Sequence, residues 1–143
     1  MLKGLPVLIV ENEPLIALDL IAAVLDQHGI VVGPVPTVAE ALAILADQSV
    51  GAAILDAKLD DRDITPVAVR LLEQAVPFVI HSGTGLPAEL AASHPDLPVI
   101  LKPKRPEDVV ASLGEQLRGG DWAKTDRASA QSTPRRRSAI PSV

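Results

Sequence analysis

Polar residues that could carry out chemistry follow four separate apolar runs of the chain. The segment Glu11–Glu13, with Asn12 between its two acids, comes after the first run, and Asp56, Ser82 and Lys102 come after three later ones. Acidic and amide oxygens bind hard cations such as Mg²⁺. An aspartate can attack phosphorus and carry the phosphoryl group, while a cation and a lysine ammonium neutralise the phosphoryl oxygens and a serine hydroxyl donates a hydrogen bond to them. The set therefore indicates phosphoryl transfer.

Each of these residues also has an ordinary structural interpretation when it is taken alone. Aspartate and serine are common turn and capping residues after a strand, and a lysine beside a proline is usually solvated. The acids of Glu11–Glu13 also suit the positive end of a following helix. The joint placement, with each group at the end of a different apolar run, favours the chemical interpretation.

Five short apolar runs, separated by helical stretches, are expected to position these groups. The predicted strands are residues 5–10, 30–32, 52–55, 78–80 and 99–101. The predicted helices are residues 15–27 with Pro14 at the first helical position, 41–46, 66–74, 87–92 and 106–117. Thr37 and Glu40 have the spacing of a capping box, and Thr65 is predicted to be the N-cap ahead of Pro66.

This alternation predicts an α/β fold with a doubly wound, five-stranded parallel sheet. Apolar runs without polar alternation need cover on both faces. Right-handed crossovers then favour the strand order 2-1-3-4-5, numbered along the chain. The carboxyl ends of such strands open on one edge, and ligands bind where the winding reverses, between the first and third strands. We therefore expect the acids, Ser82 and Lys102 to meet at that edge.

The composition of the 143 residues fits one domain and excludes several classes of function. Because the chain has no cysteine, it can form neither a disulfide nor a thiolate metal site, and it has no cysteine nucleophile. No apolar run reaches the length of a membrane span, and the first residues lack the pattern of a leader. We expect a cytoplasmic protein that does not associate with membranes.

Charge divides the chain into two parts. Residues 1–118 hold sixteen acidic and eight basic residues, whereas residues 119–143 hold two and five. An acidic body whose single aromatic residue is Phe78 argues against nucleic-acid binding by the core. The Ser, Pro and Arg content of residues 119–143 predicts a disordered basic tail. The predicted domain therefore covers residues 1–118.

Over about residues 5–117, these motifs resemble the receiver domain of bacterial response regulators. Val7–Pro14 resembles the acidic end of the family's first strand, and Ile54–Asp56 resembles its phosphoacceptor strand. Ser82 resembles its hydroxyl position, and Lys102-Pro103 resembles its lysine before a cis proline. The resemblance implies a CheY-like fold of the flavodoxin type. It also implies that Asp56 is the phosphoacceptor and that Ser82 and Lys102 are its catalytic partners.

The metal site implied by the resemblance consists of Glu11, Asn12, Asp56 and the backbone carbonyl of Lys58. Asn12 stands where the family carries its principal metal-binding aspartate, so it keeps a carbonyl oxygen but lacks a charge. We therefore expect weak Mg²⁺ binding. Val99 stands at the family's aromatic switch position, so the usual coupling of hydroxyl and aromatic ring is expected to change.

The function implied by the resemblance is that of a single-domain response regulator. Asp56 would accept a phosphoryl group from a histidine kinase or phosphotransfer protein, and the product would signal through contacts with a downstream protein that the sequence does not identify. A homodimer is compatible with this function. The segment Pro77–Gly83 resembles stand-alone receivers that partner HWE-type histidine kinases. The protein is then a phosphoacceptor rather than an enzyme, apart from hydrolysis of its own phosphoryl group.

Two other classes compete with this hypothesis. A pseudo-receiver would act as an interaction module without phosphorylation, and Asn12 is the argument for it. A phosphohydrolase of the haloacid-dehalogenase type would also use an aspartate nucleophile. That family's first-strand Asp-x-Asp pattern is absent, because the chain reads Glu11-Asn12-Glu13 at this point.

Overall fold

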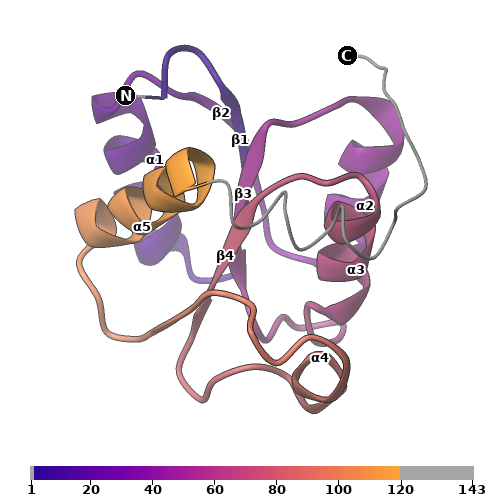
Figure 1. The fold of residues 1–143 in the computed structure, drawn as a ribbon. Helices are drawn as coiled ribbons and strands as arrows, with labels where there is room; N and C mark the ends of the chain where they lie inside the picture. Colours follow the sequence, from indigo (N-terminus) through magenta and orange to yellow (C-terminus); the bar gives the residue numbers. More distant parts are fainter. Residues whose placement is uncertain (1, 120–143) are drawn as a thin grey trace.

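The computed structural model describes residues 2–119, which form a parallel sheet with helices on both faces (Figure 1). The strand order is β2-β1-β3-β4-β5, as predicted, and all four pairings are parallel. The strands are β1 (Pro6–Val10), β2 (Ile30–Val35), β3 (Ala52–Asp56), β4 (Phe78–Ser82) and β5 (Val99–Leu101). The predicted tail, residues 119–143, lies outside the described residues except for Gly119.

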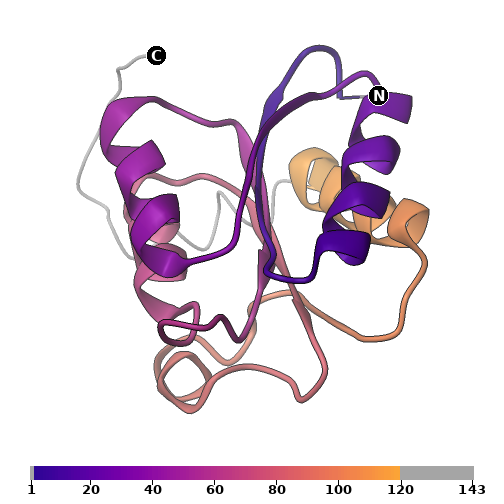
Figure 2. The ribbon, with the colours of Figure 1, turned by 180° about the vertical axis from the view of Figure 1, so that it is seen from behind.

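The helices form two layers. In Figures 1 and 2, α1 and α5 lie on one side of the sheet, and α2, α3 and α4 lie on the other. The bounds are α1 (Pro14–Asp26), α2 (Val38–Asp47), α3 (Thr65–Glu73), α4 (Ala88–Ser93) and α5 (Pro106–Gly119). Within residues 2–119, no helix combines the length and apolar character that a membrane span requires.

The central strands hold two apolar cores, one on each face of the sheet. Side chains alternate between the faces, so Leu8 and Leu55 join the core under α2–α4, whereas Ile9 and Ile54 join the core under α1 and α5. All four are at most 1% exposed. Burying one such side chain contributes about 1.5–3 kcal/mol, so the two cores hold the strand ends firmly in place.

Three strands run further than the sequence pattern predicts, and β3 does so by the single residue Asp56. β2 was expected to end at Val32 but continues to Val35, past Pro34, which has no backbone N–H to donate. The proline is accommodated because β2 is an edge strand and its register with β1 shifts at this point. β4 continues to Ser82, so His81 and Ser82 belong to the strand rather than to the loop in which they were expected.

The predicted N-cap at Thr65 is wrong. Thr65 is the first residue of α3, and Ile64 precedes it without a side-chain cap. Instead, the Asp63 carboxylate accepts a hydrogen bond from the Thr65 backbone N–H at 2.9 Å. At α2 the predicted cap is confirmed, because the Thr37 hydroxyl accepts a hydrogen bond from the Glu40 backbone N–H at 3.1 Å.

Candidate functional site

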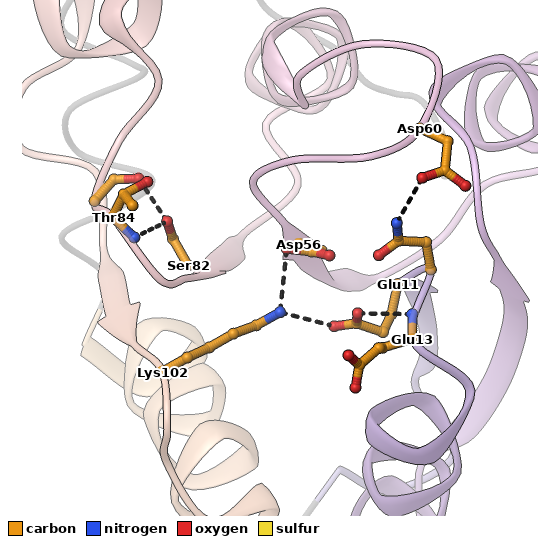
Figure 3. A network of polar contacts seen from close by, with 9 residues as sticks. Glu11, Glu13, Asp56, Asp60, Ser82, Thr84 and Lys102 are labelled. Carbon is orange, nitrogen blue, oxygen red and sulfur yellow. Dashed lines mark hydrogen bonds and ion pairs between the residues drawn. The ribbon is translucent and has the colours of Figure 1, made fainter.

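The topology brings the predicted site residues to one edge of the sheet. Glu11 directly follows β1, Asp56 is the last residue of β3, and Ser82 is the last residue of β4. Lys102 directly follows β5, and its backbone N–H donates to the Ser82 carbonyl at 2.7 Å. Because neighbouring strands are paired in register, side chains from four strand ends converge there (Figure 3).

Lys102 lies between two buried carboxylates. Its Nζ is 3.3 Å from Asp56 Oδ1 and 3.6 Å from Glu11 Oε1. The Asp56 and Glu11 side chains are 8% and 1% exposed, and that of Lys102 is 24% exposed. Buried charges need partners, because desolvation otherwise costs several kcal/mol per ion. The ammonium therefore compensates two acids at once.

The Glu11 carboxyl is strongly perturbed by its surroundings. Burial raises its pKa to about 7, and the negative charge of Asp56 acts in the same direction. The Glu13 backbone N–H, which donates to Glu11 Oε2 at 3.0 Å, and the Lys102 ammonium oppose the rise in pKa. Glu11 Oε1 has no hydrogen-bond partner among residues 2–119, since the ammonium at 3.6 Å is beyond hydrogen-bond distance. This buried acidic oxygen therefore accepts no hydrogen bond from the described residues and has the Lys102 charge as its compensation.

Asn12 makes a contact that the sequence did not predict. Its Nδ2 donates to Asp60 Oδ1 at 3.1 Å, across 48 positions of the chain. Asp60 belongs to the loop between β3 and α3, and Figure 3 shows it on the far side of the site from Lys102. The acidic loop Asp60–Asp63 was visible in the sequence, but nothing in its spacing indicated that it folds back to Asn12.

The Ser82 hydroxyl is engaged within its own loop. It donates to the Gly85 carbonyl at 2.8 Å and accepts from the Thr84 backbone N–H at 3.0 Å. In Figure 3 its side chain points toward Thr84 and away from Asp56. Gly85 has a φ of 94°, a conformation that suits glycine. Ser82 therefore lies at the same edge of the sheet as Asp56. Its hydroxyl must break the hydrogen bonds to Gly85 and Thr84 before it can reach a group bound to Asp56.

Lys58 lies two residues beyond Asp56, at the start of the β3–α3 loop. Its backbone forms an isolated antiparallel bridge with Asp63, and its side chain is exposed. The bridge fixes the path of the chain beside Asp56. Among residues 2–119, the Lys58 ammonium forms no ion pair with the buried carboxylates, in contrast to that of Lys102.

His81 lies in β4 beside this cluster. The residue is 4% exposed, and neither ring nitrogen has a hydrogen-bond partner among the described residues. Burial lowers the pKa of the imidazole and the Lys102 charge lowers it further, whereas Asp56 opposes the shift. The ring lines a cavity of about 170 Å³ between α1 and the segment that follows β5, with Ile16, Leu20 and Lys102 among its other walls. A neutral imidazole suits these surroundings.

The donor groups fit a hard cation only in part. Within residues 2–119, no group of three or more His, Cys, Asp or Glu side chains is gathered so that it could hold a metal ion. The available oxygens are the carboxylates of Glu11 and Asp56, with the amide of Asn12 beside them. Glu11 Oε1, which accepts no hydrogen bond among residues 2–119, is the kind of ligand that Mg²⁺ prefers. Two acids and an amide form a site of lower charge than three acids would.

Comparison with known proteins decides the family. No family model matches the chain, and a search of the curated proteins also finds no match. Among solved structures, SdrG from Sphingomonas melonis Fr1 is 36% identical, with a TM-score of 0.68 over 82% of this chain and 99% of that one. The chain belongs to the response-regulator receiver family.

Other solved structures extend the comparison for this receiver domain. The BeF3-activated conformation of SdrG is 39% identical, with a TM-score of 0.63 over 80% of this chain and 98% of that one. The PhyR stress response regulator is 31% identical, with a TM-score of 0.65 over 80% of the receiver chain but only 45% of PhyR. A CheY-like receiver domain protein from Methanospirillum hungatei JF-1 is 20% identical, with a TM-score of 0.70 over 85% of this chain and 98% of that one, and it shares the fold.

Proposed function

We propose that this receiver accepts a phosphoryl group on Asp56 from a histidine kinase or phosphotransfer protein and then signals through protein contacts. The observation that carries the proposal is the Asp56 carboxylate at the end of β3, with the Lys102 ammonium 3.3 Å away. A nucleophile for phosphoryl transfer needs positive charge close to the phosphoryl oxygens. Lys102 supplies that charge from a neighbouring strand end.

In the proposed transfer, a carboxylate oxygen of Asp56 attacks the phosphorus of a phosphohistidine. An O–P bond forms, the P–N bond breaks, and the electron pair leaves with the imidazole nitrogen, which takes up a proton. Lys102 then pairs with the phosphoryl oxygens in place of the free carboxylate. Ser82 reaches a further oxygen once its hydroxyl leaves the Gly85 carbonyl.

Glu11, Asn12, Asp56 and the backbone carbonyl of Lys58 would hold Mg²⁺ in this proposal. The bound cation would neutralise charge on the group being transferred. Hydrolysis of its own acyl phosphate is the only reaction that this proposal gives the protein beyond accepting the phosphoryl group. We therefore class it as a phosphoacceptor.

The relatives support the proposal and suggest its partners. SdrG has been solved in a BeF3-activated conformation, which fits a receiver that responds to a mimic of the acyl phosphate. The segment Pro77–Gly83 resembles receivers of HWE-type histidine kinases, and we propose a kinase of that type as the donor. The downstream protein would recognise the phosphorylated form, and the acidic body is unsuited to nucleic acid.

Beryllofluoride with Mg²⁺ tests the phosphoacceptor, since it forms a phosphoryl mimic on a receptive aspartate. In the full chain we expect backbone amide NMR shifts around Asp56, Ser82 and Lys102. Asp56→Asn should abolish these shifts while its spectrum stays folded, because the amide cannot bind beryllium as the carboxylate does. Asp96→Asn, in an exposed loop, is the matched control and should respond like the wild type. Equal shifts in wild type and Asp56→Asn would refute the assignment.

A pseudo-receiver is the second candidate, and one observation favours it. Position 12 carries a neutral amide, and among the described residues the site lacks a group of three metal-binding acids or imidazoles. A module of this kind would keep the fold and its partner surface without phosphorylation. A wild-type spectrum unchanged by beryllofluoride at millimolar Mg²⁺ would support it over the phosphoacceptor.

A further inference from the structure

The orientation of the Asn12 amide depends on a residue outside the four ligands considered so far. A side-chain amide is nearly symmetric in shape but has a donor at one end and an acceptor at the other. Asn12 Nδ2 donates to Asp60 Oδ1 at 3.1 Å, and a carboxylate can only accept in this contact. The Asn12 carbonyl oxygen is therefore turned away from Asp60.

Asp60 is itself held in place by the loop around it. The neighbouring Asp61 carboxylate accepts hydrogen bonds from the backbone N–H groups of Val38 and Ala39, at 3.0 and 3.1 Å, at the start of α2. Within the loop, the Leu59 N–H donates to the Arg62 carbonyl at 3.2 Å. Contacts on both sides of Asp60 thus hold the backbone that carries its exposed side chain, and the carboxylate itself contacts Asn12.

A second observation at the same edge points to a ligand. Glu11 Oε1 lies in a side chain that is 1% exposed, yet no hydrogen-bond donor among residues 2–119 reaches it. A buried carboxylate oxygen without a donor is costly, so such groups usually pair with a cation or a water. Lys102 approaches only to 3.6 Å and is shared with Asp56. Glu11 Oε1 therefore has an unfilled hydrogen-bonding capacity that a further positive group could use.

We propose that Asp60 is a positioning residue for the cation site. It holds the Asn12 amide so that the carbonyl oxygen faces the cation. The negative charge of Asp60, on the other side of Asn12, also attracts the cation and partly replaces the charge that Asn12 lacks. The inference rests on the proposed Mg²⁺-dependent phosphoacceptor and adds a residue to its site. Outer groups that orient metal ligands commonly change metal affinity by about 10–100-fold when they are removed.

The test is a Mg²⁺ titration of the full chain by calorimetry, with side-chain and backbone amide NMR in parallel. We expect Asp60→Asn to weaken Mg²⁺ binding by about tenfold, because the new amide holds Asn12 less firmly and carries no charge. Asp60→Glu should restore part of the affinity. Asp96→Asn, which removes an exposed acid from a distant loop, should leave the affinity within about twofold of wild type.

A double-mutant cycle separates orientation of Asn12 from a general effect on the fold. In an Asn12→Asp background the ligand is a carboxylate, and both of its oxygens can bind a cation whichever way the group is turned. Asp60→Asn should therefore weaken Mg²⁺ binding by less than about threefold in this background. The same loss in both backgrounds would show that Asp60 does not act by orienting the Asn12 amide and would overturn the inference.

Two further outcomes would also overturn the inference, and they bear differently on the proposed function. Equal affinities of wild type and Asp60→Asn would refute the role of Asp60 alone. A wild type with no measurable Mg²⁺ affinity would refute the cation site as well. The beryllofluoride response of Asp56 is scored separately and distinguishes that result from a failed phosphoacceptor.

Discussion

The Glu11 carboxyl, with a pKa of about 7, is about half protonated near neutral pH. Its ordinary pKa is 4.5, so between these values the folded protein binds a proton that the unfolded chain has released. The stability linked to this proton is complete below pH 4.5 and is lost as the pH rises through about 7. Ionisation of Glu11 thus lowers the free energy of unfolding, and the Lys102 ammonium and the Glu13 N–H reduce this loss.

Glu11→Gln tests this cost, because glutamine resembles the protonated carboxyl. With a chelator present, we expect the free energy of unfolding of the variant at pH 8 to exceed that of wild type by up to about 3 kcal/mol. The pKa of Glu11 rises from 4.5 to about 7, a value that already includes the attraction of Lys102, and a change of one in pKa corresponds to about 1.4 kcal/mol. The difference should shrink steadily toward pH 4.5. Urea unfolding followed by circular dichroism measures it.

A difference between Glu11→Gln and wild type that stays constant from pH 5 to pH 8 would contradict this account. Such a result would mean that Glu11 ionises with its ordinary pKa. It would also mean that Lys102 compensates the carboxylate fully.

At the scale of elements, Asp61 joins the β3–α3 loop to the start of α2. Its carboxylate accepts hydrogen bonds from the N–H groups of Val38, Ala39 and Arg62. These bonds, that of Val38 first, lower the pKa of the Asp61 carboxyl below its ordinary 3.8. The free N–H groups at a helix start carry partial positive charge, so an anion stabilises them. The same contact holds the loop that carries Asp60.

Asp61→Ala should lower the urea midpoint of unfolding at pH 7, since two N–H groups of α2 lose a charged acceptor. A carboxyl with a lowered pKa stabilises the fold above its ordinary pKa, and this contribution disappears as the pH falls through its folded value. The gap between Asp61→Ala and wild type should therefore narrow in acid. Asp96→Ala, which removes an acid with no hydrogen bond among the described residues, is the control. Equal midpoints for both variants at pH 7 would show that Asp61 does not support α2.

The elements differ in how far the sequence could predict them. Apolar runs such as Ala52–Leu55 are buried on both faces, so their pattern fixes a strand and places Asp56 at its end. The extension of β2 beyond Pro34 depended on its being an edge strand, which only the assembled sheet shows. The contacts of Asp60 and Asp61 span 48 and 23 positions, and local propensities carry no information on such partners.

At the scale of the whole molecule, the residues that form the cores and those that carry excess positive charge lie in different parts of the chain. Both apolar cores consist of residues between Leu2 and Leu117, whereas residues 120–143 contain only Trp122, Ile140 and Val143 as large apolar residues. Residues 1–118 have sixteen acids and eight bases, so the tail supplies positive charge to an otherwise acidic protein. The tail should thus influence the long-range field of the molecule more than the stability of its fold.

Deletion of residues 120–143, which ends the chain where α5 ends, tests this division. We expect the melting temperature at 0.15 M salt to change by less than about 3 °C, because a loss of about 1 kcal/mol already shifts a domain of this size by several degrees. The melting temperature of Phe78→Ala serves as the comparison, because this substitution removes packing in the core. Removal of this fully buried ring should cost about 3–5 kcal/mol and lower the melting temperature far more. If the truncated chain melts as early as Phe78→Ala, the tail packs on the body and the domain boundary near residue 118 is wrong.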